Sequence, residues 1–230
     1  MKALLQVFYS PGTLFGTLPE QSGFPVWVLP LILNALLILS VTWMVPHYIG
    51  RSNVARQQAR MLKMNPEQTE QMVKRSNEAR SETAGYVVSV LGSLLYQVMV
   101  AGALLAFALM SRRPPTFPAV LSLVTLAMFP YYLVVAGMTL LILSNAPDPP
   151  SLNSLNLIAT NPAAYLDPNS LGKGVYGLLS SLDALSLGQV GLMGYGFAKL
   201  TRSSLFAGLG AVGALWVLYL SVKILLSLMF

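Results

Sequence analysis

The stretch VWVLPLILNALLILSVTWMVPHY, residues 26–48, decides the fold of this protein. It contains no acidic residue, lysine or arginine, and it lies inside a longer uncharged run between Glu20 and Arg51. As a helix that rises 1.5 Å per residue, it is long enough to cross the roughly 30 Å of hydrocarbon in a bilayer. The stretch therefore predicts a membrane-spanning helix.

The rest of the chain repeats this pattern. Charged residues separate further apolar runs at 85–110, 117–144, 175–198 and 205–230. Only 10% of the 230 residues are charged and 55% are hydrophobic, whereas soluble domains are roughly 25% charged. We expect an all-α integral membrane protein, a bundle of about five transmembrane helices, with the two termini on opposite sides.

The N-terminal residues 1–24 differ from the predicted membrane domain, residues 25–230. They carry spaced apolar residues on both sides of Pro11, namely Leu4, Leu5, Phe8, Leu14, Phe15 and Leu18. This spacing favours an interfacial amphipathic helix. The alternative is a frayed apolar leader.

Two longer connections are expected outside the membrane. Residues 50–84 form the charged one, with Arg51, Arg56 and Arg60 after the first span and Asn65-Pro66 as the N-cap and first residue of a second helix. We expect one helix to leave the membrane and turn near Asn65, which makes this hairpin either a docking surface or simply a solvated hairpin. Residues 145–172 are rich in Pro and Asn and predict an ordered loop that folds back over the helix ends.

Asp183 is the one acidic residue inside an apolar run, and a buried charge in a membrane usually marks function. It has three interpretations: an ion or proton site, a contact for a partner, or the N-cap of a helix that starts at Ala184. The capping interpretation requires the fourth span to be broken or buried in protein, because the remainder is too short to cross a bilayer alone.

Other polar residues at membrane depth are Asn34, Gln97 and Gln189. Such side chains more often join helices than bind a substrate. Lys223, near the end of the last run, is expected to extend its ammonium toward the interface.

The sequence lacks the patterns of the common enzymes. Gly208, Gly210 and Gly213 match the dinucleotide pattern GxGxxG, but they lie in an apolar helix and not after a strand, so we interpret them as small residues for helix packing. We expect no catalytic residue, metal site or cofactor, and no nucleic-acid partner.

Several short motifs resemble the Yip domain family (Ypt-interacting proteins), in its bacterial branch. They are the opening VFYSPGTLF at 7–15, MNPEQ at 64–68, NLIATNPAAY at 156–165, Leu182-Asp183, and GYGF at 194–197. The resemblance covers nearly the whole chain, although none of these motifs is catalytic.

This resemblance implies a five-span domain with a cytoplasmic N-terminus in a bacterial inner membrane. It also implies a non-enzymatic scaffold, organiser or accessory subunit of a larger membrane complex, such as an ABC-type exporter. The hairpin and the loop at Asn161-Pro162 would contact the membrane-protein partner. The resemblance leaves open whether the protein forms a homo-oligomer. The count of basic residues instead favours a cytoplasmic hairpin, because the hairpin side carries more Lys and Arg than the N-terminal side.

Two alternatives remain. One is a small channel or transporter with a polar path along Asp183, Asn34 and Gln97. The other is a protein that shapes the lipid bilayer through its N-terminal helix.

Overall fold

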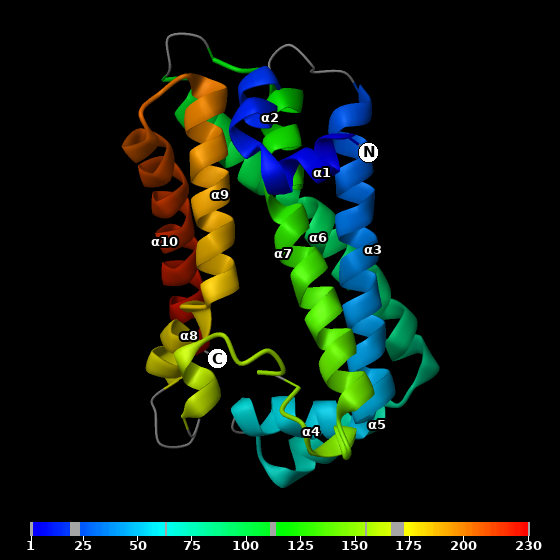
Figure 1. The fold of residues 1–230 in the computed structure, drawn as a ribbon. Coiled ribbons are helices and arrows are strands. Elements are labelled where there is room, and N and C mark those ends of the chain that lie inside the picture. Colours follow the sequence, from blue (N-terminus) through cyan, green and yellow to red (C-terminus); the bar gives the residue numbers. More distant parts are fainter. Residues whose placement is uncertain are drawn as a thin grey trace.

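The computed structural model describes residues 2–18, 24–62, 64–110, 114–154, 156–166 and 173–229, and all regular structure in these ranges is helical (Figure 1). Its elements are α1 (Lys2–Tyr9), α2 (Pro11–Thr17), α3 (Phe24–Ile49), α4 (Arg51–Met61), α5 (Pro66–Ser76), α6 (Ala79–Ala108), α7 (Phe117–Asn145), η1 (Pro149–Ser151), η2 (Pro162–Tyr165), α8 (Lys173–Ser181), α9 (Ala184–Thr201) and α10 (Leu205–Met229). Glu20, Lys63, Arg112, Arg113 and residues 167–172, which helped to bound the expected spans and loops, lie outside the described ranges.

Four of the described helices are long and apolar enough to cross a membrane, and they lie within α3, α6, α7 and α10. This finding agrees with the expected all-α membrane protein, and the expected count of about five spans stays a prediction. The N- and C-terminal ends of the chain lie toward opposite ends of the bundle (Figure 1).

The fourth expected span is not one continuous helix. The chain from 175 to 198 forms α8 and α9, which are separated by Leu182 and Asp183 in extended conformation. Of the two forms that the sequence left open for this segment, the structure has the broken one, because Asp183 caps a new helix. α9 has 18 residues, and therefore measures about 27 Å.

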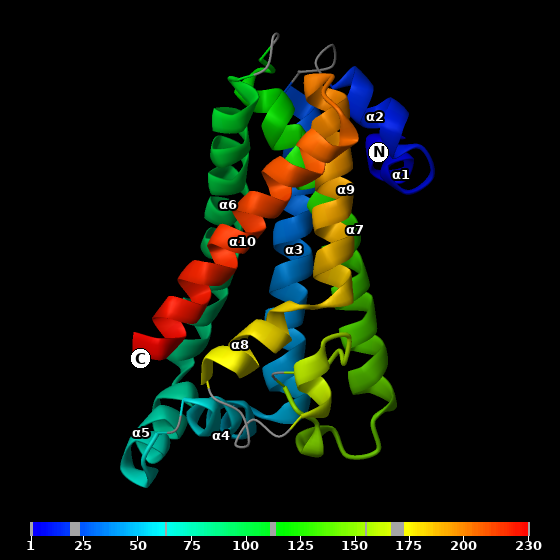
Figure 2. The same ribbon diagram turned by 90° about the vertical axis from the view of Figure 1, so that its left-hand side faces the viewer.

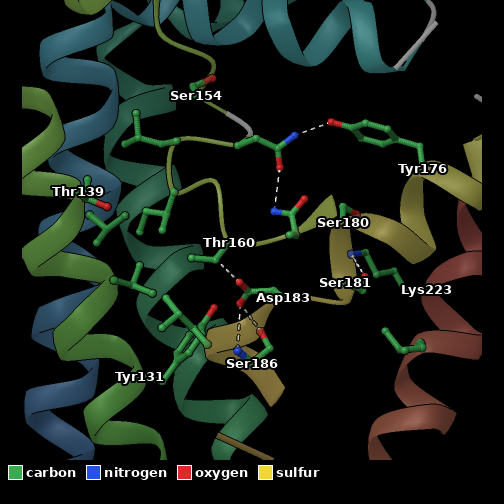
Figure 3. A pocket seen from close by; sticks show the side chains of 18 of the residues that line it. Tyr131, Thr139, Ser154, Thr160, Tyr176, Ser180, Ser181, Asp183, Ser186 and Lys223 are labelled. Atoms are coloured by element: carbon green, nitrogen blue, oxygen red, sulfur yellow. Dashed lines mark hydrogen bonds between the residues drawn. The ribbon is translucent and has the colours of Figure 1, made fainter. Parts of the chain in front are cut away.

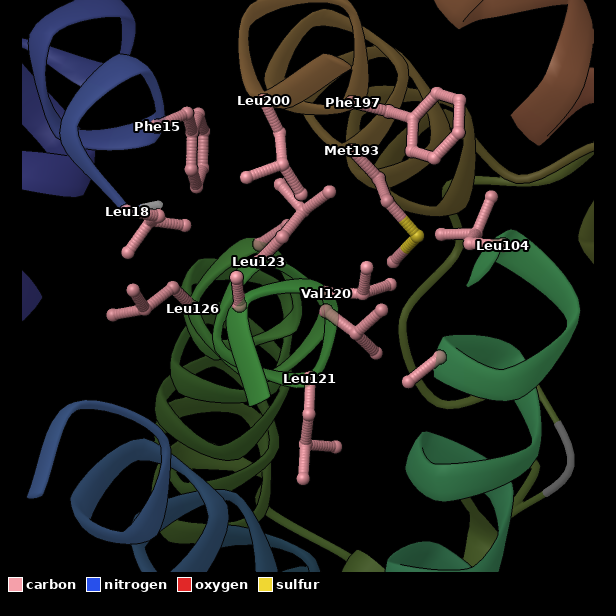
Figure 4. Packing of buried hydrophobic residues seen from close by; sticks show 14 of the residues in the cluster. Phe15, Leu18, Leu104, Val120, Leu121, Leu123, Leu126, Met193, Phe197 and Leu200 are labelled. Carbon is pink, nitrogen blue, oxygen red and sulfur yellow. The ribbon is translucent and has the colours of Figure 1, made fainter. Parts of the chain in front are cut away.

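α7 is the central helix, and it packs against α3, α6 and α9. All residues from Ala119 to Met128 are buried, and their side chains meet Phe15 of α2 and Phe197 and Leu200 of α9 (Figure 4). A helix with neighbours on every side needs apolar residues all around. This explains why the sequence of α7 shows no amphipathic pattern.

Two glycines bring α9 and α10 close together after a turn in which Arg202 adopts a left-handed conformation with φ 54°. A Cβ atom on Gly208 would collide with the carbonyl oxygen of Gly194 and would lie 2.6 Å from Cβ of Ala198. A Cβ atom on Gly210 or Gly213 would meet no atom within 4 Å. The packing interpretation of the glycine pattern therefore holds for Gly208 alone.

The N-terminal segment forms two short helices, α1 and α2, outside the bundle beside α7 and α9 (Figure 2). Leu4 and Val7 of α1 are buried, whereas Leu5 is 66% exposed and Tyr9 is 68% exposed. The expected amphipathic pattern is therefore present in two helices and not one. Their position at a membrane interface stays a prediction.

The charged connection forms a separate layer at the opposite end of the bundle (Figure 2). The expectation of one helix running out to Asn65 was wrong, because α3 ends at Ile49 and Gly50 turns the chain with φ 90°. The expected N-cap of α5 is confirmed: the Asn65 side chain accepts from the backbone N–H of Gln68, which completes a reciprocal capping box.

Candidate ligand-binding cavity

A cavity of about 500 Å³ lies beside the break between α8 and α9 (Figure 3). Its walls come from α3, α7, α8, α9, α10 and the loop at 154–161. Many of the lining side chains are polar, among them Tyr131, Asn156, Thr160, Asn161, Tyr176, Ser180, Ser181, Asp183, Ser186, Tyr219 and Lys223. Such a polar lining inside a helical membrane protein is a candidate ligand site.

Asp183 is held at the cavity wall by donors from two segments. Its Oδ2 accepts from the backbone N–H of Ser186 at 3.0 Å and from Ser186 Oγ at 2.8 Å. Its Oδ1 accepts from Thr160 Oγ1 in the loop. The capping interpretation of Asp183 is therefore confirmed, and the same carboxylate also fastens the loop to α9.

These hydrogen bonds determine the charge of Asp183, which lies outside the four apolar spans. Burial acts to raise the pKa of the carboxyl group, but the donors from Thr160 and Ser186 outweigh it, so the pKa lies below its usual value. Asp183 is therefore ionised at neutral pH.

The loop wall depends on Asn161 and Pro162. Asn161 is buried and caps η2 by accepting from the backbone N–H of Ala164 at 3.1 Å, with Pro162 as the first residue of that turn. Asn161 also donates to Asn156 Oδ1 at 3.3 Å, and Asn156 donates to the Tyr176 hydroxyl of α8 at 2.6 Å. Asn161 therefore shapes the cavity wall and does not present an exposed contact.

A residue that the sequence pattern did not single out holds this loop from the other side. Gln57 of α4 donates to the carbonyl of Leu152 at 2.9 Å and accepts from the backbone N–H of Ser154 at 2.7 Å. The charged layer and the loop are thereby joined. A glutamine in a solvated helix carries no sequence pattern that identifies such a contact.

Lys223 faces the cavity, and its expected position near the membrane interface stays a prediction. Its Nζ donates to Ser181 Oγ at 2.6 Å, across from α10 to α8 (Figure 3). Lys223 and Asp183 each lie 18 residues from the nearer end of the turn that joins α9 and α10. Measured along their helices, both residues are therefore about 27 Å from that turn.

A second cavity of about 370 Å³ shares Tyr131, Ser186, Trp216 and Tyr219 with the first, and Gln189 lines it. The shared walls make the two cavities neighbours along α9. Among the predicted site residues, the structure thus brings Asp183, Asn161 and Gln189 to one region.

Asn34 and Gln97 do not belong to this region. Both are fully buried. Asn34 Nδ2 donates to Gln97 Oε1 at 2.8 Å and to the carbonyl of Thr125 at 2.9 Å, so the pair joins α3, α6 and α7. The polar path expected along Asp183, Asn34 and Gln97 is therefore not formed, because the two amides bind each other.

The arginines of the charged layer fall into two groups. Arg56 and Arg60 of α4 are exposed and lie four residues apart on one helix face. Arg51 lines a different cavity of about 360 Å³, together with Arg75 of α5 and Tyr86 of α6.

Within the described ranges, no group of three or more His, Asp or Glu side chains is placed to hold a metal ion. His47 instead stacks on Trp43, with ring centroids 4.6 Å apart.

Fold and site together define a class: a helical protein with four described helices able to span a membrane, and a polar cavity beside the break between α8 and α9. Comparison with protein-family models, with curated proteins and with solved structures found no match. The resemblance to Yip domain proteins therefore stays a prediction.

Proposed function

We propose that this protein is a non-enzymatic, multi-pass membrane protein that binds a small polar ligand in the cavity beside Asp183. The observation that carries the proposal is that the ionised carboxylate of Asp183 and the ammonium of Lys223 line the same cavity. Burying a charged group in a bilayer costs free energy, so a charged residue there usually marks function.

Two further features support a binding role. Membrane carriers commonly build their sites at interrupted helices, where polar groups of the backbone become accessible, and the break at Leu182-Asp183 lies at this cavity. A volume of about 500 Å³ also falls in the usual range for small-molecule sites.

A cavity-filling variant tests this proposal. Val135 of α7 lines the cavity, whereas its neighbour Val134 is 38% exposed on the outer face. The wild-type protein and the Val135→Trp and Val134→Trp variants would be extracted in discs of native membrane, and the small molecules and lipids that co-purify would be identified by mass spectrometry. We expect a component that is retained by wild type and Val134→Trp and lost from Val135→Trp.

The same bound components in all three proteins would contradict the binding proposal. A ligand site in this cavity requires that the indole of Val135→Trp displaces its occupant.

A second candidate function is that of an accessory or organising subunit, as the Yip-like motifs imply. The observation that favours it is the pair Arg56 and Arg60, exposed on a helix outside the four spans. Replacing both with Glu should remove a stoichiometric partner from the protein purified in mild detergent. Lys199→Glu, near the turn between α9 and α10, is the control. Retention of every partner by the double variant would contradict this role.

We also propose that α1 and α2 lie at the interface of a bacterial inner membrane, with the N-terminus in the cytoplasm. The chain contains no cysteine, so single cysteines report the orientation directly. Leu5→Cys should be protected from, and Gln58→Cys labelled by, an impermeant maleimide added outside spheroplasts. The reverse pattern would place the N-terminus outside.

A further inference from the structure

The two charged residues of the cavity, Asp183 and Lys223, differ in how many of their hydrogen-bonding positions the protein already occupies. The carboxylate of Asp183 already accepts three hydrogen bonds, two from Ser186 and one from Thr160. It therefore acts mainly as a structural cap. A ligand meets a carboxylate whose charge is largely compensated by protein donors.

Lys223 is in the opposite situation. A lysine ammonium has three donors, and the hydrogen bond recorded for it among the described residues is the one to Ser181 Oγ at 2.6 Å. Ser181 Oγ in turn donates to the carbonyl of Gly177 at 2.8 Å. The ammonium is thus oriented by a neutral hydroxyl group and keeps donor capacity for a ligand.

A tyrosine hydroxyl adds a further donor to the cavity lining. Tyr176 accepts a hydrogen bond from Asn156 at 2.6 Å, so its own proton is available to another acceptor. Together with the remaining donors of the Lys223 ammonium, this hydroxyl fits an anion with several oxygen atoms.

The cavity also reaches the outer face of the bundle. Tyr219 lines both cavities and is still 50% exposed. Its ring lies 6.4 Å from that of Tyr96 on α6, which is 42% exposed. Both tyrosines lie within apolar spans, whose exposed faces contact lipid in a membrane, so this side of the cavity opens toward lipid.

We propose that the cavity binds a phosphate group through Lys223, and that the phosphate belongs to the headgroup of an anionic phospholipid that enters beside Tyr219. This inference rests on the proposed binding function and names the chemical class of its ligand. Lys223 lies near the end of the apolar span Leu205–Leu225, which places its ammonium near one boundary of the hydrocarbon.

The experiment uses the full-length protein, delipidated in detergent and titrated in native mass spectrometry with three probes. Phosphatidylglycerol supplies the phosphate on two acyl chains, diacylglycerol supplies the same chains without phosphate, and inorganic phosphate supplies the anion alone. We expect phosphatidylglycerol to bind in a one-to-one complex and diacylglycerol to bind at least about tenfold more weakly, because a charge-assisted hydrogen bond is lost.

Two lysine variants make the test specific. Lys223→Gln should weaken phosphatidylglycerol binding by at least about tenfold, and Lys223→Arg should retain most of the affinity because it keeps the charge and the donors. Lys199→Gln is the matched control, since Lys199 lies at the opposite end of the bundle over the ring of Tyr195.

The outcomes separate the possible ligands. Equal binding of phosphatidylglycerol by wild type and Lys223→Gln, or equal binding of diacylglycerol, would overturn the inference. Competition by millimolar inorganic phosphate, with no preference for the lipid, would keep the phosphate site but overturn its lipid source. If no phosphate compound binds while Val135→Trp still loses a co-purified component, the inference fails and the proposed function stands.

Discussion

Asn34 of α3 donates a hydrogen bond of 2.8 Å to Gln97 of α6, and both side chains are fully buried in the bundle. The same Asn34 amide group donates to the carbonyl of Thr125 in α7 at 2.9 Å. The Asn34 side chain therefore joins α3, α6 and α7. The arrangement leads to a prediction about stability and not about ligand binding.

Replacing either amide with an apolar residue should destabilise the bundle. We expect Asn34→Leu and Gln97→Leu each to lower the free energy of unfolding by about 1 kcal/mol, because each leaves a buried polar partner unpaired. The double variant should cost less than the sum of the two. Equilibrium unfolding in mixed micelles measures all four proteins, and strict additivity would show that the pair is not coupled.

Asparagine should keep part of the helix-capping role of Asp183, whereas alanine should lose it. Asp183→Ala removes the acceptor for the backbone of Ser186 and should cost about 1 kcal/mol, whereas Asp183→Asn keeps one side-chain oxygen and should cost less. Thermal unfolding of the purified proteins compares them. An equal loss in both variants would mean that charge, and not the accepted hydrogen bonds, carries the stability.

Asp183 should also make the free energy of unfolding depend on pH. Its folded pKa lies below its ordinary value, so ionisation stabilises the fold above the unfolded pKa of about 3.9, and this contribution disappears as the pH falls through the folded pKa. Asp183→Asn has no such group. The difference in melting temperature between wild type and this variant should therefore shrink below about pH 4. A constant difference over this range would contradict the assignment.

The contact between α9 and α10 should tolerate no side chain at Gly208. A methyl group there meets the carbonyl oxygen of Gly194 and Cβ of Ala198, so Gly208→Ala should destabilise by about 1–3 kcal/mol. Gly210→Ala, which meets no atom within 4 Å, is the matched control and should be neutral or slightly stabilising. Similar unfolding curves for the two variants would mean that the helices separate easily.

Gln57 should control the mobility of the loop that walls the cavity. Gln57→Ala removes the acceptor for Ser154 and the donor for Leu152, so backbone amides near 152–154 should exchange with deuterium faster. Gln58→Ala, an exposed neighbour on the same helix, is the control. Unchanged exchange in Gln57→Ala would show that other contacts hold the loop.

Much of the fold is predictable from the sequence because the bilayer imposes simple lengths. The uncharged runs at 26–48, 85–110 and 117–144 each became one long helix. The cap at Asn65-Pro66 was also visible, since an N-cap acts within three residues. The cap depends on local chemistry, and the lengths of the apolar helices depend on the thickness of the bilayer.

The site was less predictable because it depends on contacts between distant segments. Asp183 stood out as a lone acid in an apolar run, but its bond to Thr160 joins residues 23 positions apart. Lys223 approaches Ser181 over 42 positions. Hydropathy indicates only that such a lysine lies near the interface, and the contact between α10 and α8 that brings it to the cavity has no signal in the sequence.

The attachment of the loop to Gln57 has a mechanical consequence. One end of the cavity wall is fastened to α9 through Thr160 and Asp183, and the other end is fastened to α4 through Ser154 and Gln57. Because both attachments are side-chain hydrogen bonds, a displacement of α4 would pull on the same loop that Asp183 holds. The charged layer and the cavity wall are therefore expected to move together.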